Sequence, residues 1–344
     1  MSRTRSRIGL GALAGLVALL SVGCTPTGAT TPPSSTQDNV TTTSSGTAAP
    51  ASSATASASA TAAASGSAGG AAHLVVLADG VNSGVGLWTL DEASKWVALG
   101  ATPGATALGR TADGVVIATG HDVDLRPGSN LSDAGTVRSL KWSGTEPTAP
   151  IVTLDASPAG KLAFATADEV SLDYALAASD GTVTALAPAP TQSFTPQVAW
   201  LDEARLLVLA TDNMQVSRLA VVDTAGHTIT SAQAMSGVRV FGLSADRQTV
   251  AAATEHAIYV GAVATLMGQA PPSAAVTLDE LQVVWALTLD SAGSRMFMLS
   301  GTLGEDGTVG SIHELGYARQ ASAWIKVVDS AVPFTRGIGQ VWLS

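Results

Sequence analysis

Short apolar runs separated by Gly, Asp, Ser and Pro fill the chain from residue 73 onward, and residues 153–166 show this pattern most clearly. Their sequence, TLDASPAGKLAFAT, predicts a strand ending at Leu154, a turn over 157–160 and a second strand over 162–165. Proline presets one backbone angle of such a turn and glycine supplies the unusual one, so the segment is typical of a β-hairpin.

Copies of this hairpin recur at 107–119, 198–211, 241–254 and 287–300. With Thr119, Thr166, Thr211, Thr254 and Ser300 taken as equivalent, the intervals are 47, 45, 43 and 46 residues. A period in the forties with four strands per unit is typical of a β-propeller blade. Second strands begin at 73, 115, 162, 206, 249 and 295, which indicates six blades; a seven-bladed ring and a pair of β-sandwiches are the alternatives.

The segments after each hairpin predict the remaining strands of each blade. Third strands are expected at 135–142, 217–224, 256–263 and 310–317. Outer strands are expected at 182–188 and 323–329.

The two ends of the repeat region predict how the ring closes. HLVVLAD (73–79) matches a second strand without a first, and GQVWLS (339–344) matches a first strand without a second. Pairing them would remove the exposed edges of the first and last blades. The expected fold is therefore an all-β, six-bladed propeller in which the C-terminal strand (339–344) pairs with the first blade (73–99).

Residues 1–23 predict a secretory signal: three arginines in the first seven residues, a short apolar run, and then Gly23. The run is shorter than the ~20 residues of a comfortable transmembrane helix. The stretch Ser21-Val22-Gly23-Cys24 resembles the bacterial lipoprotein signal, which implies that Cys24 is lipidated, with palmitate among its acyl chains, and anchors the protein to the membrane. The alternative is an ordinary cleaved signal with an incidental cysteine.

Residues 24–72 are rich in Ser, Thr, Ala and Pro and contain one acidic residue and no aromatic residue. Such a segment cannot bury enough apolar surface to offset the entropy of ordering, so it is expected to be a disordered tether. Residues 73–344 would then form the propeller domain. Because Cys24 is the only cysteine of the chain, this domain is expected to be held by its core without disulfides.

The hairpins, with their S-P-D-G-K-like turns and small apolar second strands, resemble the TolB-like and YVTN-like propellers of bacteria over residues 73–344. This motif is a fold signature and implies no particular activity. The resemblance to WD40 repeats is one of architecture, since the chain has no Trp-Asp dipeptide. An alanine-rich, lysine-poor composition is typical of GC-rich, for example actinobacterial, genomes.

Net charge argues against a nucleic-acid partner. Without the three arginines of the signal, 14 basic residues remain against 27 acidic ones, a net charge near −13. Such a chain is repelled by phosphate backbones and by anionic lipid headgroups. Membrane association is therefore expected through the Cys24 lipid alone.

The loops between second and third strands are acidic in every blade and would lie around one mouth of the channel. Their acidic and imidazole side chains form the predicted rim: Asp79, His121, Asp122, Asp124, Asp168, Glu169, Asp212, Glu255, His256, Glu305 and Asp306. Recurring carboxylates would focus negative potential and could hold Ca²⁺, or a cationic or polyhydroxyl ligand. The alternative is that these loops are acidic because they are solvated.

His121-Asp122-Val123-Asp124 is of particular interest because it opens the longest of these loops, expected at 120–136, which also holds Arg126. Long loops within compact blades are more often functional than tight turns. If this stretch is extended, its two carboxylates share one side and could share a cation; alternatively it simply begins an exposed strand.

The chain has no G-x-S-x-G elbow and no H-E-x-x-H motif, and its tryptophans are expected to pack in the core. We therefore expect a lipid-anchored, extracytoplasmic, monomeric binding or scaffold module at the outer face of the cell membrane. Its partner would be an envelope protein or glycan. The alternative is a Ca²⁺-dependent propeller hydrolase or lactonase with its site at the channel mouth.

Overall fold

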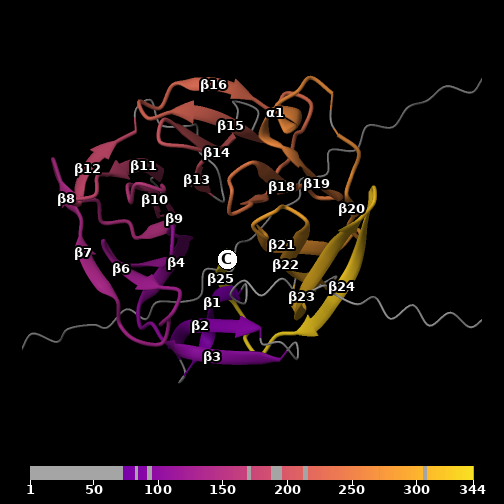
Figure 1. Cartoon of the computed structure of the whole chain (residues 1–344), viewed down its shortest axis with the longest axis horizontal. Coiled ribbons are helices and arrows are strands. Elements are labelled where there is room, and N and C mark those ends of the chain that lie inside the picture. The colour runs from indigo at the N-terminus through magenta and orange to yellow at the C-terminus, as the bar shows by residue number, and fades with distance from the viewer. Residues whose placement is uncertain are drawn as a thin grey trace, which may run out of the picture. The chain divides into compact units, whose positions relative to one another are not determined.

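A computed structural model describes residues 73–81, 84–90, 95–168, 172–186, 196–211, 216–270, 272–304 and 308–343. These residues form six sheets, antiparallel except for one added strand, arranged as the blades of one ring (Figure 1). Both the seven-bladed ring and the sandwich pair were therefore wrong alternatives. The predicted signal, Cys24 and the predicted tether lie outside the described residues. Within the described part, no helix is long and apolar enough to cross a membrane.

The blades follow one another along the chain, and the strands of each blade are named from the innermost outward. Blade 1 contains β25 (Gly337–Leu343), β1 (His73–Val81), β2 (Gly84–Leu90) and β3 (Trp96–Ala101). Blade 2 contains β4 (Ala105–Arg110), β5 (Gly114–Thr119), β6 (Asp122–Pro127) and β7 (Thr136–Ser139). Blade 3 contains β9 (Ile151–Ala156), β10 (Leu162–Ala167), β11 (Leu172–Ala177), β12 (Thr182–Ala185) and the added β8 (Lys141–Trp142).

The second half of the ring has the same arrangement. Blade 4 contains β13 (Val198–Trp200), β14 (Arg205–Thr211), β15 (Ser217–Asp223) and β16 (Thr228–Ser231). Blade 5 contains β17 (Val240–Leu243), β18 (Thr249–Ala253), β19 (Ala257–Ala262), the helix α1 (Val263–Leu266) and β20 (Val276–Thr277). Blade 6 contains β21 (Gln282–Leu289), β22 (Arg295–Leu303), β23 (Val309–Gln320) and β24 (Ala323–Ala331).

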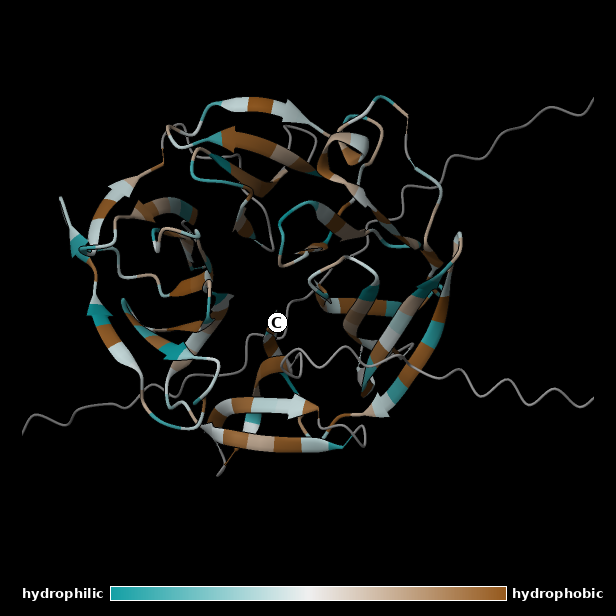
Figure 2. Cartoon of the chain, in the orientation of Figure 1, coloured by the Kyte–Doolittle hydropathy of each residue, from teal (hydrophilic) through white to brown (hydrophobic). Residues whose placement is uncertain are grey.

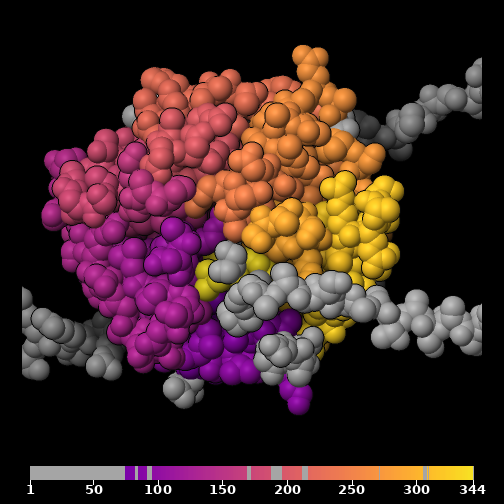
Figure 3. All heavy atoms as spheres, in the orientation of Figure 1, coloured from indigo at the N-terminus to yellow at the C-terminus, as the bar shows by residue number. Residues whose placement is uncertain are grey.

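The two ends of the domain close the ring as the sequence predicts. β25 pairs antiparallel with β1, and His73 lies opposite Leu343 in the register. In the space-filling view the yellow of β25 lies beside the indigo of blade 1 (Figure 3). Blade 1 is therefore built from both ends of the chain, whereas the other five blades are each continuous or extended by a neighbouring segment.

The core consists of six apolar clusters, one between each pair of adjacent blades. In β1, for example, Val75 and Leu77 pack toward blade 2, while Leu74 and Val76 pack toward blade 6. A strand buried on both sides is apolar throughout, which explains the continuous apolar runs of the second strands. In contrast, the outer strand β24 carries both hydrophilic and hydrophobic residues, as Figure 2 shows.

The inner strands of neighbouring blades approach closely around the channel. A Cβ added to Gly109 in β4 would lie 2.4 Å from the Leu154 carbonyl oxygen in β9. One added to Gly242 in β17 would lie 2.3 Å from the Leu287 carbonyl oxygen in β21. Glycine is required at these positions because any side chain would separate the blades.

Two strand-level predictions for blade 2 were wrong. The predicted third strand at 135–142 is instead the outer strand β7 followed by β8, which leaves blade 2 and pairs parallel with β12 of blade 3. The third strand is β6, so the predicted loop over 120–136 is a tight turn followed by a strand. Val123 is buried and Leu125 partly buried between polar neighbours, and this alternation is the mark of a strand. The other predicted third and outer strands are confirmed.

Candidate functional site

Antiparallel blades place their turns alternately on the two faces of the ring. We call the face with the turns between first and second strands the turn face. The opposite face, with the connections between second and third strands, is the loop face, and the predicted rim belongs to it.

Asp79, at the loop-face end of β1, binds the connection that leads back to β25. Its Oδ1 accepts hydrogen bonds from the backbone N–H groups of Thr335 (2.9 Å) and Arg336 (3.1 Å). Its Oδ2 accepts one from the Thr335 hydroxyl at 2.6 Å. This carboxylate therefore fastens the closure of the ring.

His121 lies in the turn between β5 and β6, and both of its ring nitrogens have partners. Nδ1 lies 2.7 Å from Glu146 Oε1, and Nε2 lies 2.9 Å from the Ala149 carbonyl oxygen. The Trp142 ring meets the imidazole edge-on, with ring centroids 5.9 Å apart. His121 thus joins its turn to the connection between blades 2 and 3.

Asp122, Asp124 and Arg126 project from one side of β6, as an extended strand requires. The Asp124 carboxylate accepts hydrogen bonds from Arg126 Nε at 2.8 Å and from the Gly135 backbone at 2.9 Å. These side chains border a small cavity of about 270 Å³, together with Thr102, Pro103, Ile117, Thr119, Val123 and Val137. Asp122 is exposed at its edge.

The other members of the predicted rim are spread around the ring. Glu255 forms an ion pair with Arg239 at 3.2 Å, and Asp168 and His256 are exposed. Glu169, Asp212, Glu305 and Asp306 lie outside the described residues. Within the described part of the chain, no three His, Cys, Asp or Glu side chains converge as metal ligands. The cation-binding rim therefore stays a prediction.

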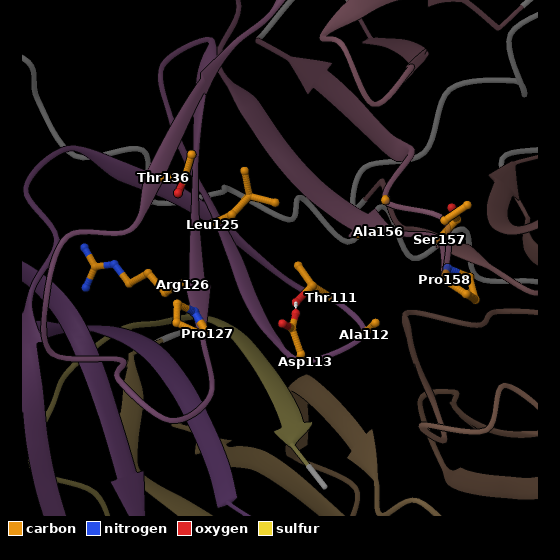
Figure 4. A pocket seen from close by; sticks show the side chains of 12 residues that line it. Thr111, Ala112, Asp113, Leu125, Arg126, Pro127, Thr136, Ala156, Ser157 and Pro158 are labelled. Carbon is orange, nitrogen blue, oxygen red and sulfur yellow. Dashed lines mark hydrogen bonds between the residues drawn. The ribbon is translucent and has the colours of Figure 1, made fainter.

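A groove of about 430 Å³ lies on the turn face between blades 2 and 3 (Figure 4). One wall is the turn between β4 and β5 with the adjacent parts of β6 and β7, and the other is the turn between β9 and β10. The groove is lined by Thr111, Ala112, Asp113, Leu125, Arg126, Pro127, Thr136, Ala156, Ser157, Pro158, Ala159 and Gly160. We call this the blade 2–3 groove.

The wall over 156–160 is held by hydrogen bonds within and beyond its turn. The Gly160 N–H donates to the Ser157 carbonyl at 2.9 Å, and Gly160 adopts a φ of 78° that glycine tolerates. The Ala159 N–H donates to Glu203 Oε1 of blade 4 at 2.9 Å, and Lys161 Nζ lies 3.1 Å from the same carboxylate. This wall is therefore fixed to the next blade.

Arg247, on the turn face of blade 5, reaches across the end of the channel to blades 3 and 4. Its Nη1 donates to Asp155 Oδ2 at 2.7 Å and to the Trp200 carbonyl, and its Nη2 donates to the Ala156 carbonyl. The Trp200 N–H donates to the same Asp155 oxygen at 2.8 Å. Both charged side chains are about nine-tenths buried, so a fully bonded ion pair connects three blades.

Arg110, at the end of β4, adds blade 2 to this set. Its Nη2 donates to the Ser244 carbonyl of blade 5 at 3.1 Å. Burial lowers the pKa of the Arg110 guanidinium from its ordinary value, and the Asp155 carboxylate opposes that shift. We call Arg110, Asp155 and Arg247 the channel cluster. It links blades 2 to 5 at the turn-face end of the channel.

Sequence analysis missed the channel cluster, although one signal was present. Arg247 occupies the position that Gly160 and Gly293 occupy in other copies of the hairpin, and all three adopt positive φ. A non-glycine residue with a φ of 62° is uncommon and strained. An arginine at a position of the repeat that favours glycine therefore indicated that its side chain has a role that offsets the backbone strain.

No protein-family model matches this chain, and no curated protein matches it. Among solved structures, a putative TolB from Agrobacterium tumefaciens is 11% identical, with a TM-score of 0.52 over 78% of this chain and 91% of that chain. A protein from Lactobacillus plantarum is 14% identical (TM-score 0.45; 79% and 99% covered), and TolB from Acinetobacter baumannii is 12% identical (TM-score 0.46; 79% and 66% covered). The likeness to the Agrobacterium structure confirms the TolB-like propeller fold and extends to the fold alone.

Proposed function

We propose that this chain is a lipid-anchored, extracytoplasmic β-propeller that acts as a binding or scaffold module. Its partner would be an envelope protein with an extended segment that docks in the blade 2–3 groove. The single observation behind this proposal is the groove itself, a concave surface of about 430 Å³ on the turn face. Ligand sites in proteins are clefts of roughly 300–1,000 Å³, mostly apolar with a few polar groups.

The lining of the groove suits an extended protein segment. Leu125, Pro127 and Pro158 offer apolar surface, while the Thr111 and Thr136 hydroxyls and the Asp113 carboxylate offer hydrogen bonds. Asp113 accepts a hydrogen bond from the Thr111 hydroxyl at 3.3 Å, so one polar pair lies at the opening. An acidic residue at this edge favours a segment that carries a positive charge.

The walls of the groove are fixed before any partner arrives. Glu203 anchors the 156–160 turn, and the channel cluster holds the inner strands of blades 2 to 5. A preorganised surface loses little conformational entropy on binding, which favours affinity. Rigid walls support a binding role for this groove.

Filling the groove tests the proposal. Ala112 is exposed at the groove edge, and Ala112→Trp would occupy the groove without touching the core. Ala225→Trp is a matched control, because Ala225 is exposed in the turn between β15 and β16 on the same face. In affinity capture from envelope extract, the full mature chain and Ala225→Trp are expected to recover the partner protein in equal amounts. Ala112→Trp is expected to recover at least tenfold less of it. Equal recovery by all three proteins would contradict the groove as the binding site.

Lipid anchoring is supported by the signal-like start of the chain and by the position of Cys24 after it. We expect the mature protein to begin at Cys24, with acyl groups on its sulfur and amino nitrogen, and to fractionate with membranes. Cys24→Ala is expected to abolish the modification and to prevent anchoring. Mass spectrometry of the mature N-terminus decides: an unmodified Cys24, or cleavage at another position, contradicts the anchor.

A further inference from the structure

Glu314 and Gln340 form a buried polar pair at the seam where the ring closes. Glu314 belongs to β23 of blade 6 and is fully buried, while Gln340 belongs to β25 of blade 1 and is 9% exposed. Gln340 Nε2 donates to Glu314 Oε1 at 3.0 Å. We call these two side chains the closing pair.

Each member of the closing pair has one oxygen without a hydrogen-bond partner among the described residues. These atoms are Glu314 Oε2 and Gln340 Oε1. An ionised Glu314 carboxylate can only accept hydrogen bonds. Glu314 Oε2 and Gln340 Oε1 would then both stay without a donor in the core, and each unsatisfied oxygen would destabilise the fold. A single proton on Glu314 Oε2 supplies the missing donor, because it can be donated to Gln340 Oε1.

The surroundings of the closing pair oppose a charge. In the sheet registers, Glu314 lies opposite Leu299 of β22 and Ser330 of β24, and Gln340 lies opposite Val76 of β1. Phe297, Ile312 and Trp342 complete the apolar cluster at this seam. None of these groups titrates.

The nearest charged side chains on the same strands lie on the other side of the sheet. His313 and Asp329 are partly exposed there and bind each other at 2.8 Å, and Lys326 binds the same carboxylate at 2.7 Å. Arg295 of β22 is on the same side of the sheet as Glu314, but it is exposed at the start of its strand, four residues before the Leu299 that lies opposite Glu314.

We propose that Glu314 is a neutral carboxylic acid in the native protein, forms a ring of two hydrogen bonds with the Gln340 carboxamide, and loosens the seam between blades 6 and 1 when it loses its proton. The proton passes to solvent as the seam opens. The closing pair thus makes closure of the propeller sensitive to alkaline pH.

The direction of the effect follows from proton binding in the two states. Burial raises the pKa of Glu314 to about 8, against an ordinary value of 4.5, and the Gln340 hydrogen bond opposes part of the shift. Between these two values the folded chain keeps a proton that the unfolded chain has lost. The contribution of Glu314 to stability is therefore complete below about pH 4.5, falls as pH rises, and is lost above about pH 8.

Glu314→Gln isolates this contribution. An amide at residue 314 can form the same two hydrogen bonds with Gln340 and has no proton to lose. The ratio of the unfolding constants, wild type over Glu314→Gln, is expected to rise by up to tenfold per pH unit between about pH 4.5 and 8, and then to level off. Urea unfolding of the full mature chain over this range measures the ratio. Asp122→Asn, at an exposed acid, is the matched control and should leave the wild-type profile unchanged.

A ratio independent of pH would overturn the proposal, since Glu314 would then titrate alike in both states. Two further measurements apply to the wild type even if Glu314→Gln does not fold. Infrared difference spectra between neutral and alkaline pH should show the carbonyl band of a protonated carboxylic acid disappear. As pH rises from neutral to alkaline, hydrogen exchange of the β25 amides, corrected for the intrinsic rate, should become faster relative to that of the β4 amides. The proposal is contradicted if the infrared band is absent at neutral pH, or if the exchange rates of β25 and β4 change equally with pH.

Discussion

At the scale of single residues, polar side chains, some of them buried, join the blades of this protein. Asp79, Arg247 and Glu314 each bind partners distant in the sequence, and each lies at an end or a seam of a blade. Buried charges are tolerated when every donor and acceptor finds a partner, and the removal of one partner is costly. These residues therefore determine how the blades are held against one another, beyond what the apolar clusters provide.

Arg247 allows backbone strain and side-chain bonding to be separated. Arg247→Ala is expected to destabilise the protein by about 3–5 kcal/mol, because it leaves Asp155 buried without its cation. Arg247→Gly removes the same bonds but relieves the positive φ, so it should cost about 1–2 kcal/mol less than Arg247→Ala. Urea unfolding at neutral pH measures both free energies.

The exposed Arg295, at the start of β22, provides the control for Arg247. Its replacement by alanine should change the free energy of unfolding by less than about 0.5 kcal/mol. If Arg247→Ala costs no more than Arg295→Ala, the channel cluster does not hold the blades together.

At the scale of elements, the hairpin was predictable and the outer strands were less so. Turn chemistry is local, so a segment such as 153–166 shows its two strands directly in the sequence. Whether 135–142 forms a third strand or an outer one depends on β8 pairing with β12 of the next blade, which is a tertiary contact. The alternation of Val123 and Leu125 with polar neighbours was the local signal for β6. The motif at 121–124 was placed in a loop, and the structure confirms the alternative, that it begins a strand.

The outer strands also show how exposed edges are protected. Ile229 in β16 and Val327 in β24 are 55% and 53% exposed, and each is the extra residue of a β-bulge. A bulge interrupts the regular edge that another strand would need for pairing. In β24, Lys326 beside the bulge adds a charge that further disfavours strand addition.

The pairing of β25 with β1 predicts the outcome of circular permutation. Leu343 and His73 lie opposite each other, so a short Asn-Gly link can join them as a hairpin. With new ends in the exposed turn over 224–225, the permutant is expected to fold to the same circular dichroism spectrum, with a melting temperature within a few degrees of wild type.

Two co-expressed fragments, 73–224 and 225–344, are the control for the permutant. They have the same chain break between 224 and 225 but lack the Asn-Gly link. A permutant that is unfolded while these fragments associate would show that the link strains the β25–β1 closure.

At the scale of the whole molecule, the ring has two faces, and sequence reasoning pointed to the loop face. Its acidic and imidazole side chains were visible in the sequence, but most of those described are bonded to their own chain, as Asp79, His121 and Asp124 illustrate. The blade 2–3 groove instead forms where turns of two blades, about 45 residues apart in the repeat, face each other. No pattern within one repeat reveals such a concavity, because it depends on how adjacent blades are inclined.

Site-specific photocrosslinking in living cells tests the central claim, that a partner segment occupies the blade 2–3 groove. A photoreactive amino acid at Thr136, exposed in the groove, should yield a discrete adduct with one envelope protein, and Ala112→Trp should abolish it. The same probe at His256, exposed on the loop face, should yield no adduct with that protein. An adduct from His256 with none from Thr136 would contradict docking in the groove and place binding on the loop face.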